Sequence, residues 1–227
     1  MKRINMLFIT AVLFITASFS ISTANANGDG KLDEILDNMQ KNAASIKTIY
    51  AKMEQVKRDR SIGGAEKYSG EIFFKHVGKN NDKVRINYSV PKGQTLWIEG
   101  AEITLYQEAL KQAIITSRRA AAAKGDEFAF VATPYTSVPD LKRQYNIVYV
   151  GEEQGMAKLD LTPKGKSSLR KLTLWVDQSS WLPTKSQVTE ANNNETTFTL
   201  SGVKQNSVIS DGTFKVKLPG GTKTIRK

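Results

Sequence analysis

The chain has 227 residues, enough for one sizeable core and on the low side for two. Its 40% hydrophobic and 24% charged residues are typical of a globular protein and exclude a disordered one. Cysteine is absent, which excludes disulfides and thiolate metal sites. The formal net charge of +11 favours attraction to anionic surfaces, although basic residues spread along the chain are typical of a solvated surface.

The N-terminus has the three parts of a secretory signal. Two basic residues precede an uncharged run at 6–19, and a small-x-small site follows at 24–26. An uncleaved anchor is the alternative, but the run is shorter than the ~20 residues that a membrane-spanning helix needs. We therefore interpret 1–26 as a signal peptide and 27–227 as a single domain exported to a bacterial periplasm. Export argues against nucleic acid as a partner.

An amphipathic helix follows a polar spacer, with Asp29 as its expected N-cap. Its apolar stripe has the i, i+3, i+4, i+7 spacing of one helix face and consists of Leu32, Ile35, Leu36, Met39, Ala43 and Ile46. The period changes near Thr48, where alternation up to Val56 predicts a strand. Residues 57–67 are polar and are predicted to form a turn or flexible tip around Gly63-Gly64.

The clearest alternation lies in Lys83–Val90, where Val84, Ile86 and Tyr88 share one side. Short loops separate this stretch from similar runs, which occupy 71–75, 94–98, 103–106 and 111–117. The pattern predicts an antiparallel meander with one apolar face.

Residues 118–141 break the strand rhythm, and the four alanines at 120–123 predict short helices and loops. Further strands are predicted at 145–150, 156–161, 171–176, 184–190 and 196–200. The alternation of Phe214, Val216 and Leu218 predicts a last strand before a basic tail. The sequence thus indicates a mainly β, α+β fold of about ten or eleven strands, which must curl, close or be covered.

Catalytic chemistry has little support in the sequence. His76 is the single histidine, and a lone histidine is typical of a surface residue. The chain has no metal-ligand spacing, no nucleophile elbow and no glycine-rich phosphate loop. The acidic pairs Glu152-Glu153 and Asp29 with Asp33 lie in a predicted turn and at a helix start, where such residues are common. We expect no enzyme activity, no catalytic residues, no metal and no cofactor.

Six short segments, in this order, resemble the periplasmic outer-membrane lipoprotein carriers of the LolA type. They span almost the whole chain after the signal peptide and are Ile49–Gln55, Tyr68–Lys75, Val84–Tyr88 with Pro91, Glu99–Tyr106 with Gln112, Leu159–Lys164 and Phe214–Pro219.

The resemblance implies an unclosed antiparallel β-barrel wrapped around helices that act as a lid. The cavity would hold the acyl chains of a lipoprotein moving from an inner-membrane exporter to an outer-membrane acceptor, and the carrier would be a monomer. Family members commonly have Lys-Arg-Pro after the strand that matches Ile72–Lys75, and that arginine holds the lid shut. Here Lys75-His76-Val77 stands in its place, so His76 and Arg85 are the candidates for the lid latch.

Strand alternation and the resemblance together select the residues expected to line the lipid cavity. They are Leu36, Met39, Met53, Ile72, Phe74, Val84, Ile86, Tyr88, Leu96, Ile98, Leu172 and Leu174. Two alternatives share the fold: a carrier of another lipid or glycolipid, and a lipid-sensing regulator of the envelope that transports nothing.

Overall fold

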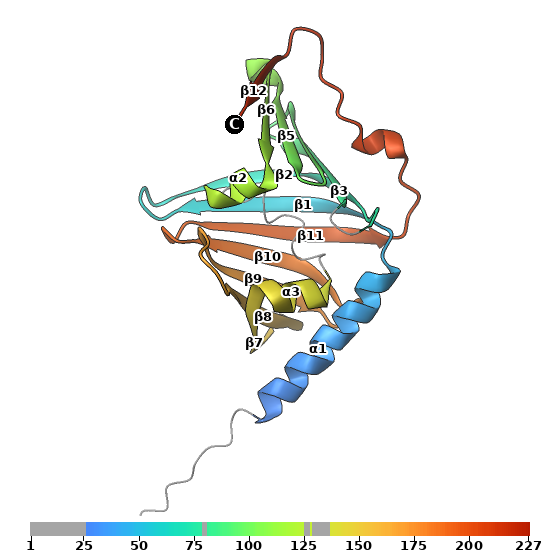
Figure 1. The fold of residues 1–227 in the computed structure, drawn as a ribbon, viewed down its shortest axis with the longest axis vertical. Coiled ribbons are helices and arrows are strands. Elements are labelled where there is room, and N and C mark those ends of the chain that lie inside the picture. Colours follow the sequence, from blue (N-terminus) through green and yellow to red (C-terminus); the bar gives the residue numbers. More distant parts are fainter. Residues whose placement is uncertain (1–25, 79–80, 125–127, 129–136) are drawn as a thin grey trace, which may run out of the picture.

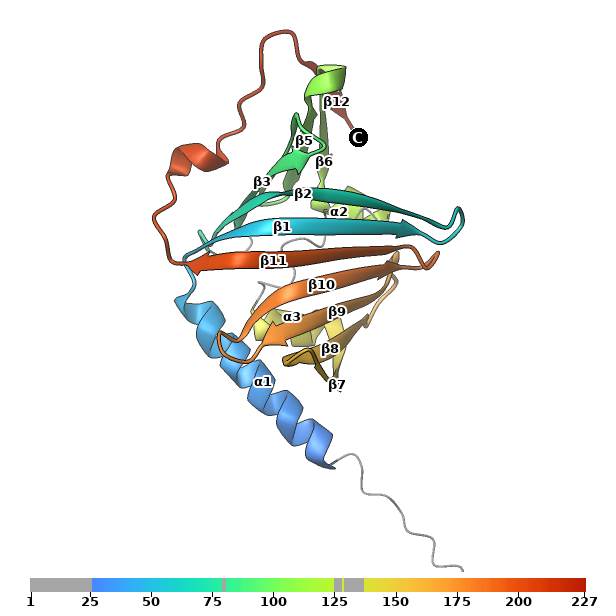
Figure 2. The ribbon, with the colours of Figure 1, turned by 180° about the vertical axis from the view of Figure 1, so that it is seen from behind.

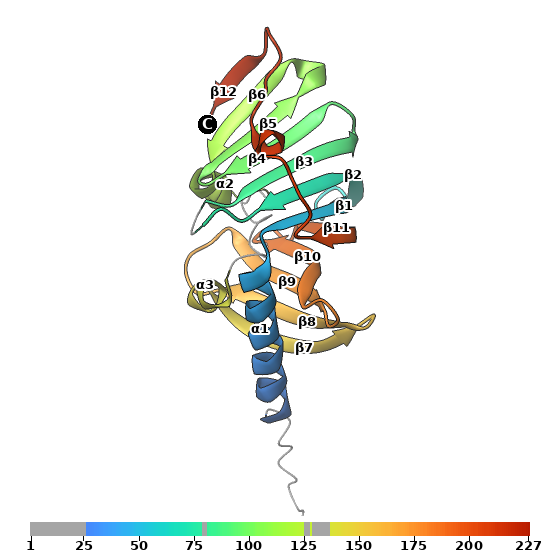
Figure 3. The ribbon, with the colours of Figure 1, turned by 90° about the vertical axis from the view of Figure 1, so that its right-hand side faces the viewer.

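In the computed structural model, which describes residues 26–78, 81–124, 128 and 137–227, one twelve-stranded sheet forms the body of the protein. The strand order is β12-β6-β5-β4-β3-β2-β1-β11-β10-β9-β8-β7, so β12 and β7 are the two edges and the sheet does not close. Figure 3 shows the sheet bent, with α2 and α3 on its concave side. The fold is therefore α+β with an unclosed barrel, as expected.

The elements follow the chain in a nearly unbroken meander (Figure 1). The first half contains α1 (Ala26–Ser45), β1 (Thr48–Asp59), β2 (Gly64–Lys75), β3 (Lys83–Val90), β4 (Gln94–Glu99), β5 (Glu102–Gln107), η1 (Glu108–Leu110), β6 (Gln112–Ser117) and α2 (Arg118–Ala123). The second half contains α3 (Val138–Gln144), β7 (Tyr145–Glu153), β8 (Met156–Pro163), β9 (Leu169–Asp177), β10 (Leu182–Glu190), β11 (Glu195–Gln205), η4 (Asp211–Phe214) and β12 (Lys223–Arg226).

The central strands β1 and β2 are longer than predicted. They pair from Thr48↔Lys75 to Asp59↔Gly64, so much of the expected polar loop at 57–67 is strand. The apolar alternation ends where the strands leave the core, but the backbone ladder continues into solvent (Figure 2). Gly63 lies in the connecting turn with φ +70°, as its position in the sequence indicates.

Two predictions about the ends of the chain were wrong. α1 begins at Ala26, which places Asp29 in its first turn rather than at an N-cap. Residues 214–218 do not form a strand: Phe214 ends η4, and the last strand is β12 in the basic tail. β12 pairs in parallel with β6, because the segment before it crosses the outer side of the sheet and reaches that edge from the far end.

One apolar cluster fills the concave side of the sheet and includes inward-facing residues of α1, α3 and most strands. Alternation dictates this face: Val84, Ile86 and Tyr88 are buried in it, as predicted. A smaller set of buried residues lies on the outer side, where Trp97 alternates with Leu96 and Ile98 of the main cluster. The sheet therefore has cover on both faces.

Gly70 tests how tightly β2 and β3 approach one another. A Cβ at this position would lie 2.2 Å from the backbone oxygen of Asn87, which a side-chain adjustment cannot relieve. We expect Gly70→Ala to lower the free energy of unfolding in urea by about 1–3 kcal/mol, the usual range for overpacking. Gly64→Ala is the control, because nothing lies within 4 Å of its Cβ. Equal stability of the two variants would contradict this account.

Candidate functional site

The candidate site is the concave face of the sheet, which α1 and α3 cover. α1 packs against β7, β10 and α3, and it buries Ile35, Leu36 and Met39 against the sheet. The helical spacing of these three residues places them on one side, so the opposite side, with Asp37 and Lys41, is exposed. Figures 1 and 2 show the N-terminal part of α1 extending beyond the sheet.

All twelve residues expected to line a lipid cavity are buried in the apolar cluster of this face. Met39 and Phe74 border a pocket, and Met53 and Ile72 border a deeper cavity of about 10 Å³. The space beside Met53 and Ile72 is thus nearly filled while α1 is in place. The role of the twelve selected residues as a lipid lining stays a prediction.

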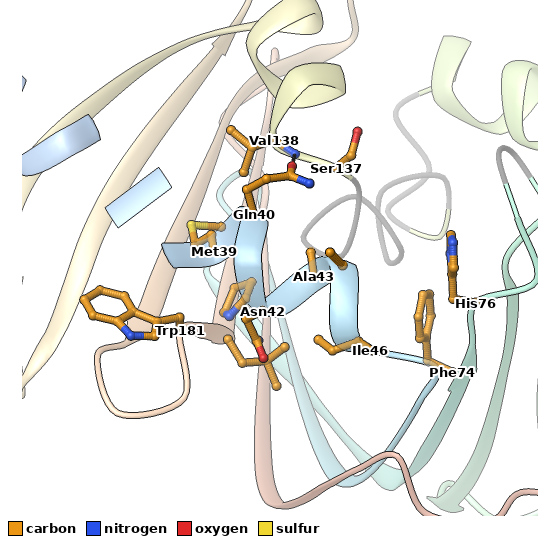
Figure 4. A pocket seen from close by; sticks show the side chains of 13 residues that line it. Met39, Gln40, Asn42, Ala43, Ile46, Phe74, His76, Ser137, Val138 and Trp181 are labelled. Atoms are coloured by element: carbon orange, nitrogen blue, oxygen red, sulfur yellow. Dashed lines mark hydrogen bonds between the residues drawn. The ribbon is translucent and has the colours of Figure 1, made fainter. Parts of the chain in front are cut away.

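A pocket of about 200 Å³ lies where the C-terminal part of α1 meets α3 and the sheet (Figure 4). Its lining is mostly apolar and comprises Met39, Gln40, Asn42, Ala43, Ala44, Ile46, Phe74, His76, Ser137, Val138, Trp181, Leu182 and Pro183. Ligand pockets usually measure about 300–1,000 Å³, so this one is too small for a long acyl chain. It is the seam along which α1 could separate from the sheet.

The turn between β9 and β10 places Trp181 beside this pocket, a residue that strand alternation did not single out. The Asp177 carboxylate accepts hydrogen bonds from Ser179 and Ser180, and its backbone oxygen accepts from Trp181 N at 2.6 Å. Trp181 has φ +53°, a conformation that the turn imposes. The hydrogen bonds that Ser179 and Ser180 donate to the carboxylate hold the Asp177 pKa below its ordinary value, and the Ser179 hydroxyl contributes most.

A side-chain hydrogen bond at the pocket connects the two covering helices, and an ion pair at 3.6 Å between Lys142 of α3 and Asp33 of α1 also joins them. The Val138 backbone N–H, at the start of α3, donates to Gln40 Oε1 at 3.0 Å. Ser137 caps the same helix end by accepting from Asp140 N. α1 and α3 therefore form one cover rather than two separate ones.

The two latch candidates lie in different places. His76 borders the pocket, and its Nδ1 lies 2.6 Å from Asp82 Oδ1 across the β2–β3 connection. Arg85 points to the outer face, where it donates to the backbone oxygen of Thr213 at 2.9 Å and lies over the ring of Trp97. Burial lowers the Arg85 pKa. Of the two, only His76 is near α1.

A second hollow of about 160 Å³ lies at the other end of the concave face, between β5, β6 and α2. Its lining includes Ile103, Leu105, Ile114 and Phe128, none of which was selected from the sequence. α2 consists largely of alanine, which has too little volume to fill the space above these strands. The small side chains at 120–123 were the feature of the sequence that could have indicated this hollow.

Other kinds of site lack support in the part of the chain that the structure describes. That part contains no group of three or more histidine, aspartate or glutamate side chains that could hold a metal ion. It also contains no helix that is both long and apolar enough to cross a membrane.

The fold and the site define a class of protein in which helices cover the apolar side of an unclosed β-sheet. The model of the family described as outer membrane lipoprotein carrier protein LolA matches residues 44–217, and the chain belongs to this family.

The relatives agree with this assignment. Outer-membrane lipoprotein carrier proteins of Nitrosospira multiformis and Dechloromonas aromatica are 26% and 24% identical to this chain, of which the alignments cover 90% and 86%. They cover 91% and 88% of the two relatives. An uncharacterized conserved protein of Thermus thermophilus shares the fold, with a TM-score of 0.52, 13% identity and coverage of 87% of this chain and 99% of its own.

Gln40→Ala tests the connection between the helices. The Val138 N–H loses its acceptor, so local opening of α3 should become easier by the value of one hydrogen bond, about 0.5–1.5 kcal/mol. We expect amide hydrogen exchange within α3 to be roughly two- to tenfold faster. Lys41→Ala, on the exposed side of α1, serves as the control. Unchanged exchange in Gln40→Ala would show that this hydrogen bond does not couple α1 to α3.

Asp177→Asn tests the turn that carries Trp181. Because the folded-state pKa of Asp177 is lowered, its contribution to stability is present above the unfolded pKa of ~3.9 and is lost as pH falls through the folded value. The difference in unfolding free energy between wild type and variant should therefore be constant near neutral pH and shrink below about pH 4. Asp37→Asn, an exposed change on α1, is the control. A difference independent of pH would contradict this account.

Proposed function

We propose that this protein is a periplasmic carrier that binds the acyl chains of lipoproteins beneath α1 and α3. It receives them from an inner-membrane exporter and passes them to an outer-membrane acceptor. The observation that carries the proposal is the apolar concave face of an unclosed sheet, covered by helices with a pocket at their seam. Membership of the lipoprotein carrier family and the names of the relatives support it.

The free energies allow α1 and an acyl chain to exchange places. Full burial of one aliphatic side chain contributes about 1.5–3 kcal/mol, so Ile35, Leu36 and Met39 together contribute roughly 5–9 kcal/mol. An acyl chain gains ~0.8 kcal/mol per methylene, or on the order of 10 kcal/mol in total. Since the two gains are similar, the net affinity stays modest and the cargo can be released.

The proposal includes export and a binding role without catalysis. Removal of residues 1–26 in the periplasm would leave Asn27 as the first residue, and a monomer would suffice for the task. No reacting group is needed, because uptake exchanges one apolar surface for another.

Recovery of the bound material tests the function. The full chain, expressed with its own signal and isolated from the periplasm, should carry an acylated N-terminal cysteine peptide that mass spectrometry identifies after extraction. The intact mass of the same preparation should correspond to a chain that begins at Asn27. Free lipid or glycolipid without a peptide, or no acyl group at all, would overturn the lipoprotein assignment.

Ala43→Trp provides the matched test of the site. Ala43 lines the pocket, and an indole there would occupy the space that the first part of an acyl chain must enter. We expect recovery of the acylated peptide to fall several-fold. Lys41→Trp places the same indole on the exposed side of α1 and should leave recovery unchanged. Equal loss in both variants would point to damage of the helix rather than of the pocket.

A further inference from the structure

Three loops at one end of the strands form a continuous edge, which we call the tip rim (residues 57–67, 163–170 and 190–195). Ala191 N donates to Ser168 O at 2.8 Å, which joins the β8–β9 and β10–β11 loops. Arg60 N donates to Asn194 Oδ1 at 3.1 Å, which joins the β10–β11 turn to the β1–β2 hairpin. Figures 1 and 2 show the β1–β2 and β10–β11 tips side by side at this end.

The tip rim is basic on its exposed surface. Its exposed cations are Arg58, Arg60, Lys67, Lys164, Lys166 and Arg170. Arg58, Lys67 and Lys166 have no ion pair among the residues that the structure describes. The positive field is therefore available to an external partner.

The tip rim also contains four carboxylates, Asp59, Glu66, Glu190 and Glu195. Asp59 accepts hydrogen bonds from Ser61, which lower its pKa, and Glu195 pairs with Arg60 at 3.2 Å. Glu66, the exposed one, accepts from the Tyr68 hydroxyl at 2.6 Å. The hydrogen bonds leave the carboxylates charged, so the seven basic and four acidic residues give the tip rim a net charge of +3.

An aliphatic side chain projects from the outermost turn of this basic edge. Ile62 is 81% exposed, although a single exposed aliphatic residue is common on protein surfaces and proves nothing alone. Here the turn is held in one conformation: the Asp59 carboxylate accepts from Ser61 N at 2.8 Å, and its backbone oxygen accepts from Gly63 N at 3.1 Å. The structure thus presents Ile62 at a hydrogen-bonded tip, two residues after the cation Arg60.

We propose that the tip rim docks on an anionic phospholipid bilayer, with Ile62 entering the interface and the cations lying against the lipid phosphates. An aliphatic insertion combined with a polybasic surface is the pairing that gives reversible attachment to a membrane. An acidic protein is less suited to this surface, because stable protein interfaces have aromatic anchors and a packed apolar centre. The proposal does not depend on the carried cargo.

The orientation has a consequence for the pocket. His76 and Trp181 lie at the ends of β2 and β9, which are the strand ends opposite to the tip rim. A molecule attached through the tip rim therefore keeps the seam between α1 and the sheet directed away from the bilayer. The attachment holds the protein at the membrane and leaves the pocket open to a protein partner.

Vesicle sedimentation tests the attachment with the full chain that begins at Asn27. The protein should pellet with phosphatidylcholine vesicles that contain phosphatidylglycerol, release at high salt, and stay in solution with phosphatidylcholine alone. Each Lys or Arg near the surface is worth about 1 kcal/mol, so Arg58→Gln, Lys67→Gln and Lys166→Gln should each weaken the partition roughly fivefold. Lys217→Gln, an exposed change in the C-terminal segment, is the control. Equal binding to both vesicle types, no binding, or equal effects of all four substitutions would overturn the proposal.

A labelled cysteine tests the role of Ile62 directly, because the chain has no cysteine of its own. Ile62→Cys carrying an environment-sensitive dye should become several-fold brighter on phosphatidylglycerol vesicles. Val208→Cys, at a fully exposed aliphatic position beyond the other end of β11, should not change in brightness. A silent label at 62 on pelleted protein, or binding by the tip rim to an acidic protein but not to vesicles, would overturn the proposal. Lipopeptide recovery is a separate readout, so either proposal can fail alone.

Discussion

An antiparallel sheet whose edges do not meet leaves an apolar concave face that something must cover. Here β12 and β7 remain apart, and the inward residues of most strands form one cluster with α1 and α3. The cover is not part of the hydrogen-bonded sheet, so it can leave without breaking a strand ladder. Its removal exposes apolar surface, which makes uncovering favourable only when another apolar group takes its place.

The two halves of the sheet differ in how they are held. On the β3–β4 half, the outer face has its own cover, because Phe214 is buried there and Arg85 donates to Thr213 O. The C-terminal segment then ends as β12 on the edge of β6. Packing on both faces restrains this half, whereas α1 lies on the half formed by β7 and β10. We therefore place the proposed opening at the α1 side, where the pocket lies.

Alternation predicted most of the strands and the buried face, because the side of each residue follows from backbone geometry alone. It failed at Phe214, Val216 and Leu218, whose alternation cannot show whether a sheet edge is available to them. It also missed Trp181, since its place at the pocket depends on a turn held by Asp177. Buried residues could be predicted from local pattern, but the pocket could not, because it arises where separate elements meet.

The long central hairpin connects the proposed membrane contact with the pocket. β1 and β2 run from the covered face, where Ile49 and Phe74 are buried, out to the solvent-exposed turn at Ile62. Apolar alternation ends partway, yet the backbone pairing continues to Asp59↔Gly64. If the polar outer part of the hairpin served only to join β1 to β2, a shorter turn near Val56 would suffice. The extra length, fixed by Asp59 and tied to Asn194, instead carries charge and one aliphatic residue away from the core.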